Sequence, residues 1–208
     1  MEKYVIFDLD GTLNQTDLYA VEAYKTALSK RGRNIERDEI IACIGLSPAD
    51  IIKKLFGSLN EEETTAWSSD IRELEFNFME KKARVFDGVH ETLQMLKDKG
   101  YGLAICSNAF PAHIEHVLEV LHIRTYFDLI GSLDLGKTKS DVLGQLLKEI
   151  VPAHACMAGD RKFDLEAARA NGIPFIGCAY GYAPGEIQKA DIIIHKFGEL
   201  TGAAEALI

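Results

Sequence analysis

The stretch Val5-Ile6-Phe7-Asp8-Leu9-Asp10-Gly11-Thr12-Leu13 places two carboxylates, one residue apart, where an apolar strand runs into a glycine turn. Side chains alternate between the two faces of a strand, so Asp8 and Asp10 share a face as long as the chain stays extended. Two carboxylates about 4 Å apart repel by roughly 4 kcal/mol at an effective dielectric constant of about 20. The pair must therefore bind a cation, share a proton or point apart, and we expect a bound cation.

The composition predicts a globular protein with an acidic surface. The 208 residues are 47% hydrophobic, which allows one good core and a small inserted module. The net charge of −9 argues against nucleic acid or an anionic membrane as the main partner and favours a small molecule or a protein. The sequence has neither a signal peptide nor an apolar stretch of about 18 residues. We expect a cytoplasmic protein that acts as a monomer or homodimer.

The cysteines also favour a reducing compartment. They lack CxxC spacing, and three of them lie in apolar runs that are typical of strands: the four are Cys43, Cys106, Cys156 and Cys178. We interpret them as reduced thiols of the core. A zinc site would need clustered Cys or His ligands, which this spacing does not offer.

Short β-rich runs alternate with amphipathic segments along most of the chain, which predicts an α/β fold. Strand, helix, strand alternation implies a parallel sheet covered on both faces. Ligands of such sheets bind at the carboxyl ends of the strands, where Asp8 and Asp10 are expected. The expected strands are 4–8, 101–106, 127–130, 155–158, 174–178 and 191–195, and the expected helices between them are 88–99, 111–121, 140–150 and 163–171.

Residues 16–84 interrupt this alternation. They contain helical patterning without a convincing strand, and they are far more than one crossover helix requires. An inserted helical module therefore fits better than a loop. Its expected helices are 18–30, 37–43, 49–56 and 61–82.

Further polar residues follow the later strands of the expected sheet. Ser107 and Asn108 come after one strand, and Gly159-Asp160, with Asp164 four residues on, comes after another. Lys137 and Lys139 lie at a loop-to-helix junction between them. Each group alone is typical of a turn, a helix cap or a solvated surface, but their order places all of them at one edge of the sheet.

Three carboxylates, a hydroxyl and a lysine are the groups that phosphoryl transfer through an aspartyl phosphate requires. Mg²⁺ takes oxygen ligands, and Asp8, the backbone carbonyl of Asp10 and Asp160 can supply part of its shell. Ser107 and a loop amide can donate to the equatorial phosphate oxygens. Asp10 can protonate the leaving oxygen and later deprotonate water.

This set of residues resembles the haloacid dehalogenase (HAD) superfamily over the whole chain. Asp8-Leu9-Asp10-Gly11-Thr12 is similar to its first motif, Ser107 to its second, a lysine to its third, and Gly159-Asp160 with Asp164 to its fourth. The resemblance implies a Rossmann-like core, residues 1–15 and 85–208, with an all-helical cap domain, residues 16–84, inserted after the first motif.

The resemblance also implies a role for each residue that matches a motif. Asp8 would be the nucleophile, Asp10 the acid and base, and Ser107 and the lysine the phosphate anchors. Asp160 would bind the metal, with Asp164 in support. Members that cleave carbon–halogen bonds lack a carboxylate at the position of Asp10, so phosphate esters are favoured over halides.

The lysine of the third motif has two candidates. The family often has Lys-Pro-x-Pro-Asp, and prolines are absent here. The form Thr-Lys-x-Asp-Val of phosphoglycolate-phosphatase-like members matches Thr138-Lys139-Ser140-Asp141-Val142, so we favour Lys139 over Lys137.

The cap is expected to select the substrate. Ile44-Gly45-Leu46-Ser47-Pro48 resembles the specificity loop of the family, so Gly45 and Ser47, together with Asn108 of the core, are the predicted substrate contacts. An ordinary turn between helices, capped by Ser47, explains the same residues. Mutases of the family carry an arginine in this loop, and Pro48 or its neighbours stand in its place here.

The sequence thus predicts a Mg²⁺-dependent phosphatase that hydrolyses a small phosphorylated metabolite, such as a phosphoglycolate-like compound or a sugar phosphate. Two alternatives stay open. A phosphosugar mutase similar to β-phosphoglucomutase would use the same intermediate. A receiver-like binding or signalling module would also carry an acidic cluster and a lysine, although such modules have about 120 residues and no cap.

Overall fold

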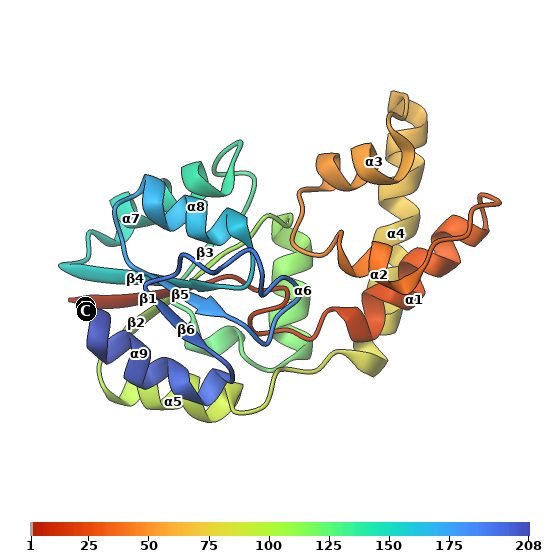
Figure 1. Ribbon diagram of the computed structural model, residues 1–208. Helices are drawn as coiled ribbons and strands as arrows, with labels where there is room; N and C mark the ends of the chain where they lie inside the picture. Colours follow the sequence, from red (N-terminus) through yellow and green to blue (C-terminus); the bar gives the residue numbers. More distant parts are fainter. Residues whose placement is uncertain (1) are drawn as a thin grey trace.

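A six-stranded parallel sheet forms the centre of the protein in a computed structural model that describes residues 2–208 (Figure 1). The strand order is β3-β2-β1-β4-β5-β6. The bounds are β1 Lys3–Phe7, β2 Gly102–Cys106, β3 Leu129–Gly131, β4 His154–Gly159, β5 Phe175–Cys178 and β6 Ile192–Ile194. The predicted α/β class and parallel sheet are confirmed, and each expected strand overlaps an observed one.

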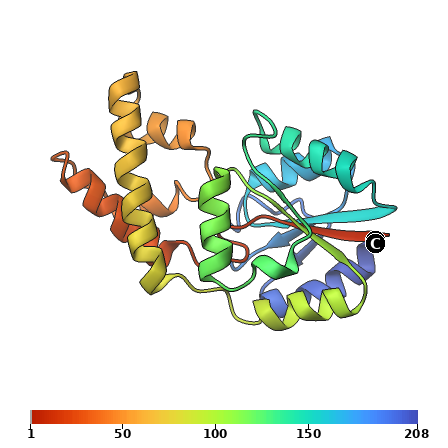
Figure 2. The same cartoon turned by 180° about the vertical axis from the view of Figure 1, so that it is seen from behind.

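Helices cover both faces of the sheet (Figures 1 and 2). Helices α7 (Lys139–Ile150) and α8 (Lys162–Ala170) lie over one face, and α5 (Val89–Asp98) and α9 (Leu200–Leu207) lie over the other. Short 3₁₀ turns at Arg124–Tyr126 and Phe197–Glu199 complete this part of the chain. Helix α9 was not among the expected elements.

The alternation along β1 explains how one strand serves both faces. Tyr4 and Ile6 pack in the apolar cluster beneath α7 and α8, whereas Val5 and Phe7 pack in the cluster beneath α5 and α9. All four side chains are buried. Central strands of parallel sheets are apolar on both faces for this reason. Continuing the alternation to Asp8 directs its side chain toward α7 and α8.

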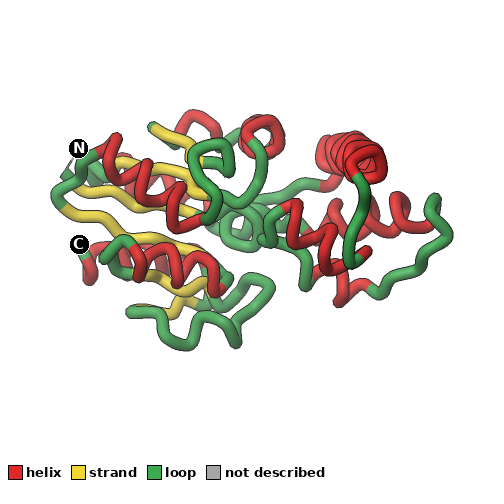
Figure 3. The backbone as a smooth tube through the Cα atoms, turned by 90° about the horizontal axis from the view of Figure 1, so that it is seen from above, coloured by secondary structure: helices red, strands yellow, loops and turns green. Residues whose placement is uncertain are grey.

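Four helices gather beyond the carboxyl ends of the strands, away from the sheet (Figures 1 and 3). They are α1 (Asp17–Ser29), α2 (Arg37–Ile41), α3 (Pro48–Phe56) and α4 (Glu61–Lys82), and we call them the helical group. The Trp67 ring packs edge-on against Phe56, with centroids 4.9 Å apart, and against Tyr24 at 5.8 Å. Within residues 2–208, no helix has the length and apolar composition of a membrane span.

The segments that enter and leave the helical group run side by side. The Gln15 N–H donates to the Arg84 carbonyl at 2.9 Å, and the Phe86 N–H donates to the Leu13 carbonyl at 3.0 Å. The Gln15 side chain adds a bond to the Val85 carbonyl at 2.7 Å. Helix α6 (Pro111–Val120) lies between the sheet and α4 (Figure 2). These contacts hold the helical group next to the strand ends.

We predict that Gly102→Ala destabilises the sheet. Gly102 pairs in register with Tyr4, and a Cβ at position 102 would overlap the Tyr4 ring. Overpacking of this kind costs about 1 to 3 kcal/mol, measured as the free energy of unfolding in urea. In a Tyr4→Val background the cost of Gly102→Ala should fall below about 1 kcal/mol.

Gly202→Ala is the matched control for this substitution. Gly202 lies in α9, where an added Cβ meets open space, so alanine should raise the free energy of unfolding by about 0.5 to 1 kcal/mol. Equal costs for Gly102→Ala with and without Tyr4 would contradict the packing argument.

Candidate active site

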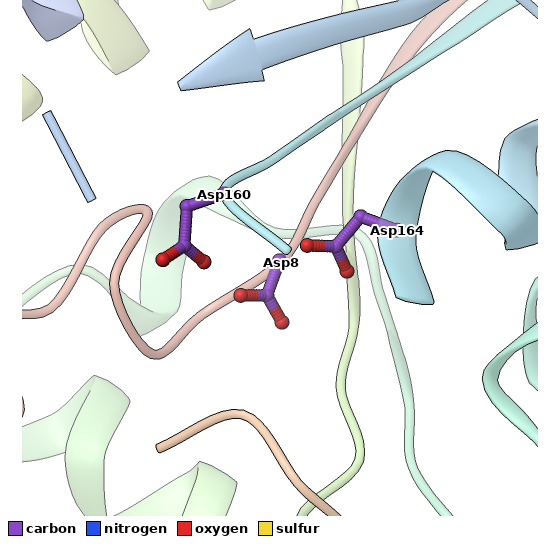
Figure 4. Close-up of side chains that lie close together, drawn as sticks. All are labelled: Asp8, Asp160 and Asp164. Carbon is purple, nitrogen blue, oxygen red and sulfur yellow. The ribbon is translucent and has the colours of Figure 1, made fainter. Parts of the chain in front are cut away.

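Three buried carboxylates converge at the carboxyl ends of two neighbouring strands (Figure 4). Asp8 follows β1, Asp160 follows β4, and Asp164 lies in the first turn of α8. One oxygen from each carboxylate lies within 4.8 Å of the others. None of the three residues is more than 2% exposed. The parallel pairing of β1 with β4 brings Asp8 beside Asp160 although they are far apart in the sequence.

Lys139 is the cation of this cluster. Its Nζ lies 2.5 Å from Asp8 Oδ1 and 2.5 Å from Asp164 Oδ1, and its side chain is buried. Lys139 is the first residue of α7, which begins there because the Thr138 side chain and the Asp141 side chain cap the helix reciprocally. Lys137 is exposed. Of the two candidate lysines, Lys139 is therefore the one that contacts the carboxylates.

The buried charges do not balance, since three carboxylates face one ammonium group. Burial raises the pKa of Asp8 to about 7, against the attraction of Lys139. Burial also raises the pKa of Asp160 well above its ordinary value, with Asp8 and Asp164 adding to the shift. Burial lowers the pKa of Lys139, but the carboxylates of Asp164 and Asp8 outweigh it and raise the pKa overall. A further positive charge would stabilise the ionised cluster.

The donor set fits Mg²⁺. Asp160 Oδ1 is buried without a hydrogen-bond partner, whereas Asp160 Oδ2 accepts the Tyr182 N–H at 2.7 Å. Gly11 leaves room beside it, because a Cβ there would lie 2.6 Å from Asp160 Oδ2 and the residue has a φ of +94°. A hard cation prefers carboxylate oxygens of this kind, and an orphaned buried oxygen is a ready ligand.

Asp10 does not share the partners of Asp8. Asp10 Oδ1 accepts the Thr16 hydroxyl at 2.6 Å and the Asn14 amide at 3.0 Å. Asp10 Oδ2 lies 3.9 Å from Nε2 of His113, on α6. The chain turns directly after Asp10, so the two carboxylates of the first motif have separate surroundings. Asp8 lies among the other buried carboxylates and Lys139, whereas Asp10 accepts hydrogen bonds from a hydroxyl and an amide.

A cavity of about 250 Å³ extends from these residues into the helical group. Asp8, Asp10 and Ser107 line one end of it. Ser107 is buried after β2, and its Oγ accepts the Ala109 N–H at 3.1 Å. Asn108 also lines the cavity. Ser107 thus lies beside the carboxylates, as the order of the motifs predicts.

The loop at residues 44–48 is attached to the sheet side of the cavity through its backbone. The Asn108 amide donates to the Gly45 carbonyl at 3.0 Å, and the Arg161 guanidinium donates to the Ile44 carbonyl. Gly45 lines the cavity, but Ser47 does not. The Ser47 hydroxyl instead accepts the Asp50 N–H at 3.2 Å as the N-cap of α3, so the capped-turn alternative describes Ser47.

Three residues near the site were missed by sequence reasoning. Arg161 bridges the loop and Glu186, whose Oε2 lies 3.0 Å from Arg161 Nε. His113 lies between Asp10 and Glu75 of α4, with its Nδ1 3.8 Å from Glu75 Oε2. The signal for Arg161 is its position beside Asp160, but contacts of His113 and Glu75 arise only when α4 packs against α6.

Comparison with known proteins identifies the family. The family model described as haloacid dehalogenase-like hydrolase matches residues 5–178. The chain belongs to this family. The resemblance drawn from the motifs is confirmed, and so is the prediction of a HAD-type phosphatase enzyme.

Several relatives of this HAD-like hydrolase are named as phosphatases. A probable phosphatase, IndB, of Dickeya dadantii is 34% identical over 100% of this chain and 96% of that protein. A phosphoglycolate phosphatase of Agrobacterium fabrum is 30% identical over 95% of this chain and 90% of that protein. The crystal structure of a predicted phosphatase from Clostridium acetobutylicum superposes with a TM-score of 0.88 at 27% identity, covering 100% of both chains.

We predict that Glu75→Gln changes the pH dependence of stability of this HAD-like hydrolase. The Glu75 side chain is 13% exposed, and burial raises its pKa from 4.5 to about 7, although His113 favours the charged form. Between these pH values the folded state holds a proton that the unfolded state has released. The contribution of Glu75 to stability therefore falls as the pH rises through this window.

Glutamine removes this penalty, so the variant should gain stability relative to the native chain as the pH rises from 5 to 8, by up to about 3 kcal/mol in urea unfolding. Glu73→Gln, an exposed position on the same helix, controls for the loss of one charge. A constant difference between the Glu75→Gln variant and the native chain across the pH range would contradict the assignment.

Proposed function

We propose that this protein is a Mg²⁺-dependent phosphatase that hydrolyses a small phosphate monoester through an aspartyl phosphate on Asp8. The observation that carries the proposal is the position of Lys139, with its Nζ 2.5 Å from the carboxylates of both Asp8 and Asp164, in a cluster that also holds the buried Asp160. This arrangement places a carboxylate nucleophile beside a cation that favours its ionised form and attracts a phosphate dianion.

In the first step, an oxygen of Asp8 attacks phosphorus and the ester oxygen leaves. Lys139, which contacts Asp8, and the hydroxyl of Ser107, which lines the cavity with Asp8, compensate the charge that spreads over the equatorial phosphate oxygens. The bond from phosphorus to Asp8 forms as the bond from phosphorus to the alcohol oxygen breaks. The phosphoryl group is then held on Asp8.

Asp10 is the proton carrier. Its carboxylate lines the cavity and is held by Thr16 and Asn14 rather than by the lysine. In its protonated form it donates to the departing alcohol, and as a carboxylate it accepts a proton from the water that attacks the aspartyl phosphate. The second step releases inorganic phosphate and restores Asp8.

Asp8, the Asp10 backbone carbonyl and Asp160 would hold the Mg²⁺, and Asp164 would position the cluster by pairing with Lys139. When bound, Mg²⁺ supplies positive charge beside the phosphoryl group during transfer. The buried, unpartnered Asp160 Oδ1 supports this assignment.

We further propose that residues 16–84 act as a cap domain over the site and that Gly45 and Asn108 contact the substrate from the two sides of the cavity. The acidic net charge of −9 supports a small-molecule substrate rather than nucleic acid. The four free, buried cysteines support a cytoplasmic location. A monomer or homodimer stays a prediction.

Hydrolysis is favoured over the mutase alternative. A mutase has to bind a second phosphate group of a sugar bisphosphate. Residues 44–48 contribute no lysine or arginine to the cavity. The loop side chains that line it are those of Ile44, Leu46 and Pro48, and apolar groups cannot compensate a second dianion.

We predict that Asp8→Asn abolishes phosphate release while the fold is retained. The amide is a poor nucleophile, and it also weakens the metal site, so kcat should fall by at least about 10⁴-fold. The test measures inorganic phosphate from a panel of phosphoglycolate, sugar phosphates, nucleotides and pyrophosphate, with Mg²⁺ and with a chelator. Circular dichroism checks the fold. Native-rate turnover by the pure variant, or turnover unaffected by the chelator, would overturn the proposed mechanism.

We predict that substitutions of Lys139 and Lys137 have different effects in the same assay. Lys139→Met should lower kcat/KM by at least about 100-fold because it removes the cation that contacts Asp8. Lys137→Met is the matched control, and it should stay within about twofold of the native rate because that side chain is exposed. A larger loss in the Lys137 variant would transfer the anchor role to that residue.

A further inference from the structure

The wall of the cavity becomes apolar with distance from the carboxylates. At the far end its walls are apolar side chains from three helices and the loop between two of them. These side chains are Ile40, Leu46, Ile51, Ile52, Trp67 and Ile71. Trp67 is 3% exposed and closes the cavity at the interior of the helical group. Surfaces of this kind favour an apolar ligand and penalise an unpaired charge.

Charged groups along the walls point to the same conclusion. Among the described residues that line the cavity, the single lysine or arginine is Arg72, whose residue is exposed. Glu75, which is largely buried, and Asp10 also line it, with His113 between them, and neither carboxyl group offers a positive charge to an anion. The buried cation, Lys139, is already paired with Asp8 and Asp164 at the phosphate end.

The size of the cavity limits the ligand. Its volume is about 250 Å³, and an apolar cavity of about 150 Å³ is sufficient to hold benzene. A phosphoryl group at Asp8 and one ring against Ile71 and Trp67 would therefore fill it.

We propose that the preferred substrate is a phosphate monoester of an uncharged alcohol with an apolar body of about one ring, held between Leu46 on the loop and Ile71 and Trp67 on α4. This inference rests on the proposed phosphatase function and narrows it. Phosphoglycolate, pyrophosphate and sugar bisphosphates carry a second anionic group, which these walls do not compensate.

The first test compares three esters of primary alcohols, so that leaving-group chemistry is similar. They are benzyl phosphate, ethyl phosphate and 2-phosphoglycolate, each assayed with Mg²⁺ for phosphate release. We expect kcat/KM for benzyl phosphate to exceed that for each of the others by about tenfold or more. A preference for 2-phosphoglycolate would overturn the inference and leave the phosphatase function standing.

The second test introduces a cation into the apolar wall. Leu46→Arg should lower kcat/KM for benzyl phosphate by about tenfold and raise it for 2-phosphoglycolate. The preference for benzyl phosphate over 2-phosphoglycolate should therefore decrease or reverse. Met95→Arg adds the same charge at an exposed position of α5 outside the cavity and should leave both values within about twofold. Parallel changes for both substrates in the Leu46→Arg variant would contradict the role of the wall.

A third test does not depend on turnover. Trp67 is the only tryptophan of the chain and lines the cavity, so its fluorescence reports occupancy directly. Benzylphosphonate should change the emission at concentrations at least about tenfold lower than phosphonoacetate. If neither these three esters nor the wider panel of phosphate compounds is hydrolysed, the phosphatase proposal fails, whereas the fluorescence titration still decides the preference of the cavity. Equal affinities, or tighter binding of phosphonoacetate, would overturn the inference.

Discussion

The contact of Lys139 with both Asp8 and Asp164 is the interaction on which the rest of the site depends. It joins the end of β1 to the first turns of α7 and α8, and all three side chains are buried. Removing one partner of such a pair leaves an uncompensated buried charge, at a cost of about 3 to 5 kcal/mol. The contact is therefore a structural tie between β1, α7 and α8, and it also opposes the rise in the pKa of Asp8 that burial causes.

The position of Asp8 could be predicted from the strand alone, because alternation along β1 directs position 8 to the side of Tyr4 and Ile6, where α7 and α8 pack. The later motifs were found for the same reason, since parallel strands end at one edge. The hydrogen-bond partners of the Asp10 side chain could not be predicted. Its orientation depends on the turn at Gly11 and on Thr16, Asn14 and His113, whose positions follow from packing between elements.

The helical group shows a second limit of sequence reasoning. Its helices were predicted from apolar periodicity, but periodicity does not distinguish a side chain that packs in a core from one that lines a cavity. Ile40, Trp67 and Ile71 are buried and also line the cavity. Burial of the apolar face stabilises each helix whichever surface it covers. The cavity wall therefore carries no sequence signal of its own, and only the assembled structure shows which side chains border open space.

In the loop at residues 44–48, backbone groups attach the loop to the sheet side of the cavity, whereas side chains line the cavity. On the sheet side, the Asn108 amide donates to the Gly45 carbonyl, and the Arg161 guanidinium donates to the Ile44 carbonyl. Because these bonds do not depend on loop side chains, Leu46 can change without loss of the attachment. The ion pairs that hold Lys139 and its carboxylate partners in place do not involve Leu46. In the proposed function, the cluster performs the chemistry, whereas Leu46 on the loop contributes to the choice of alcohol.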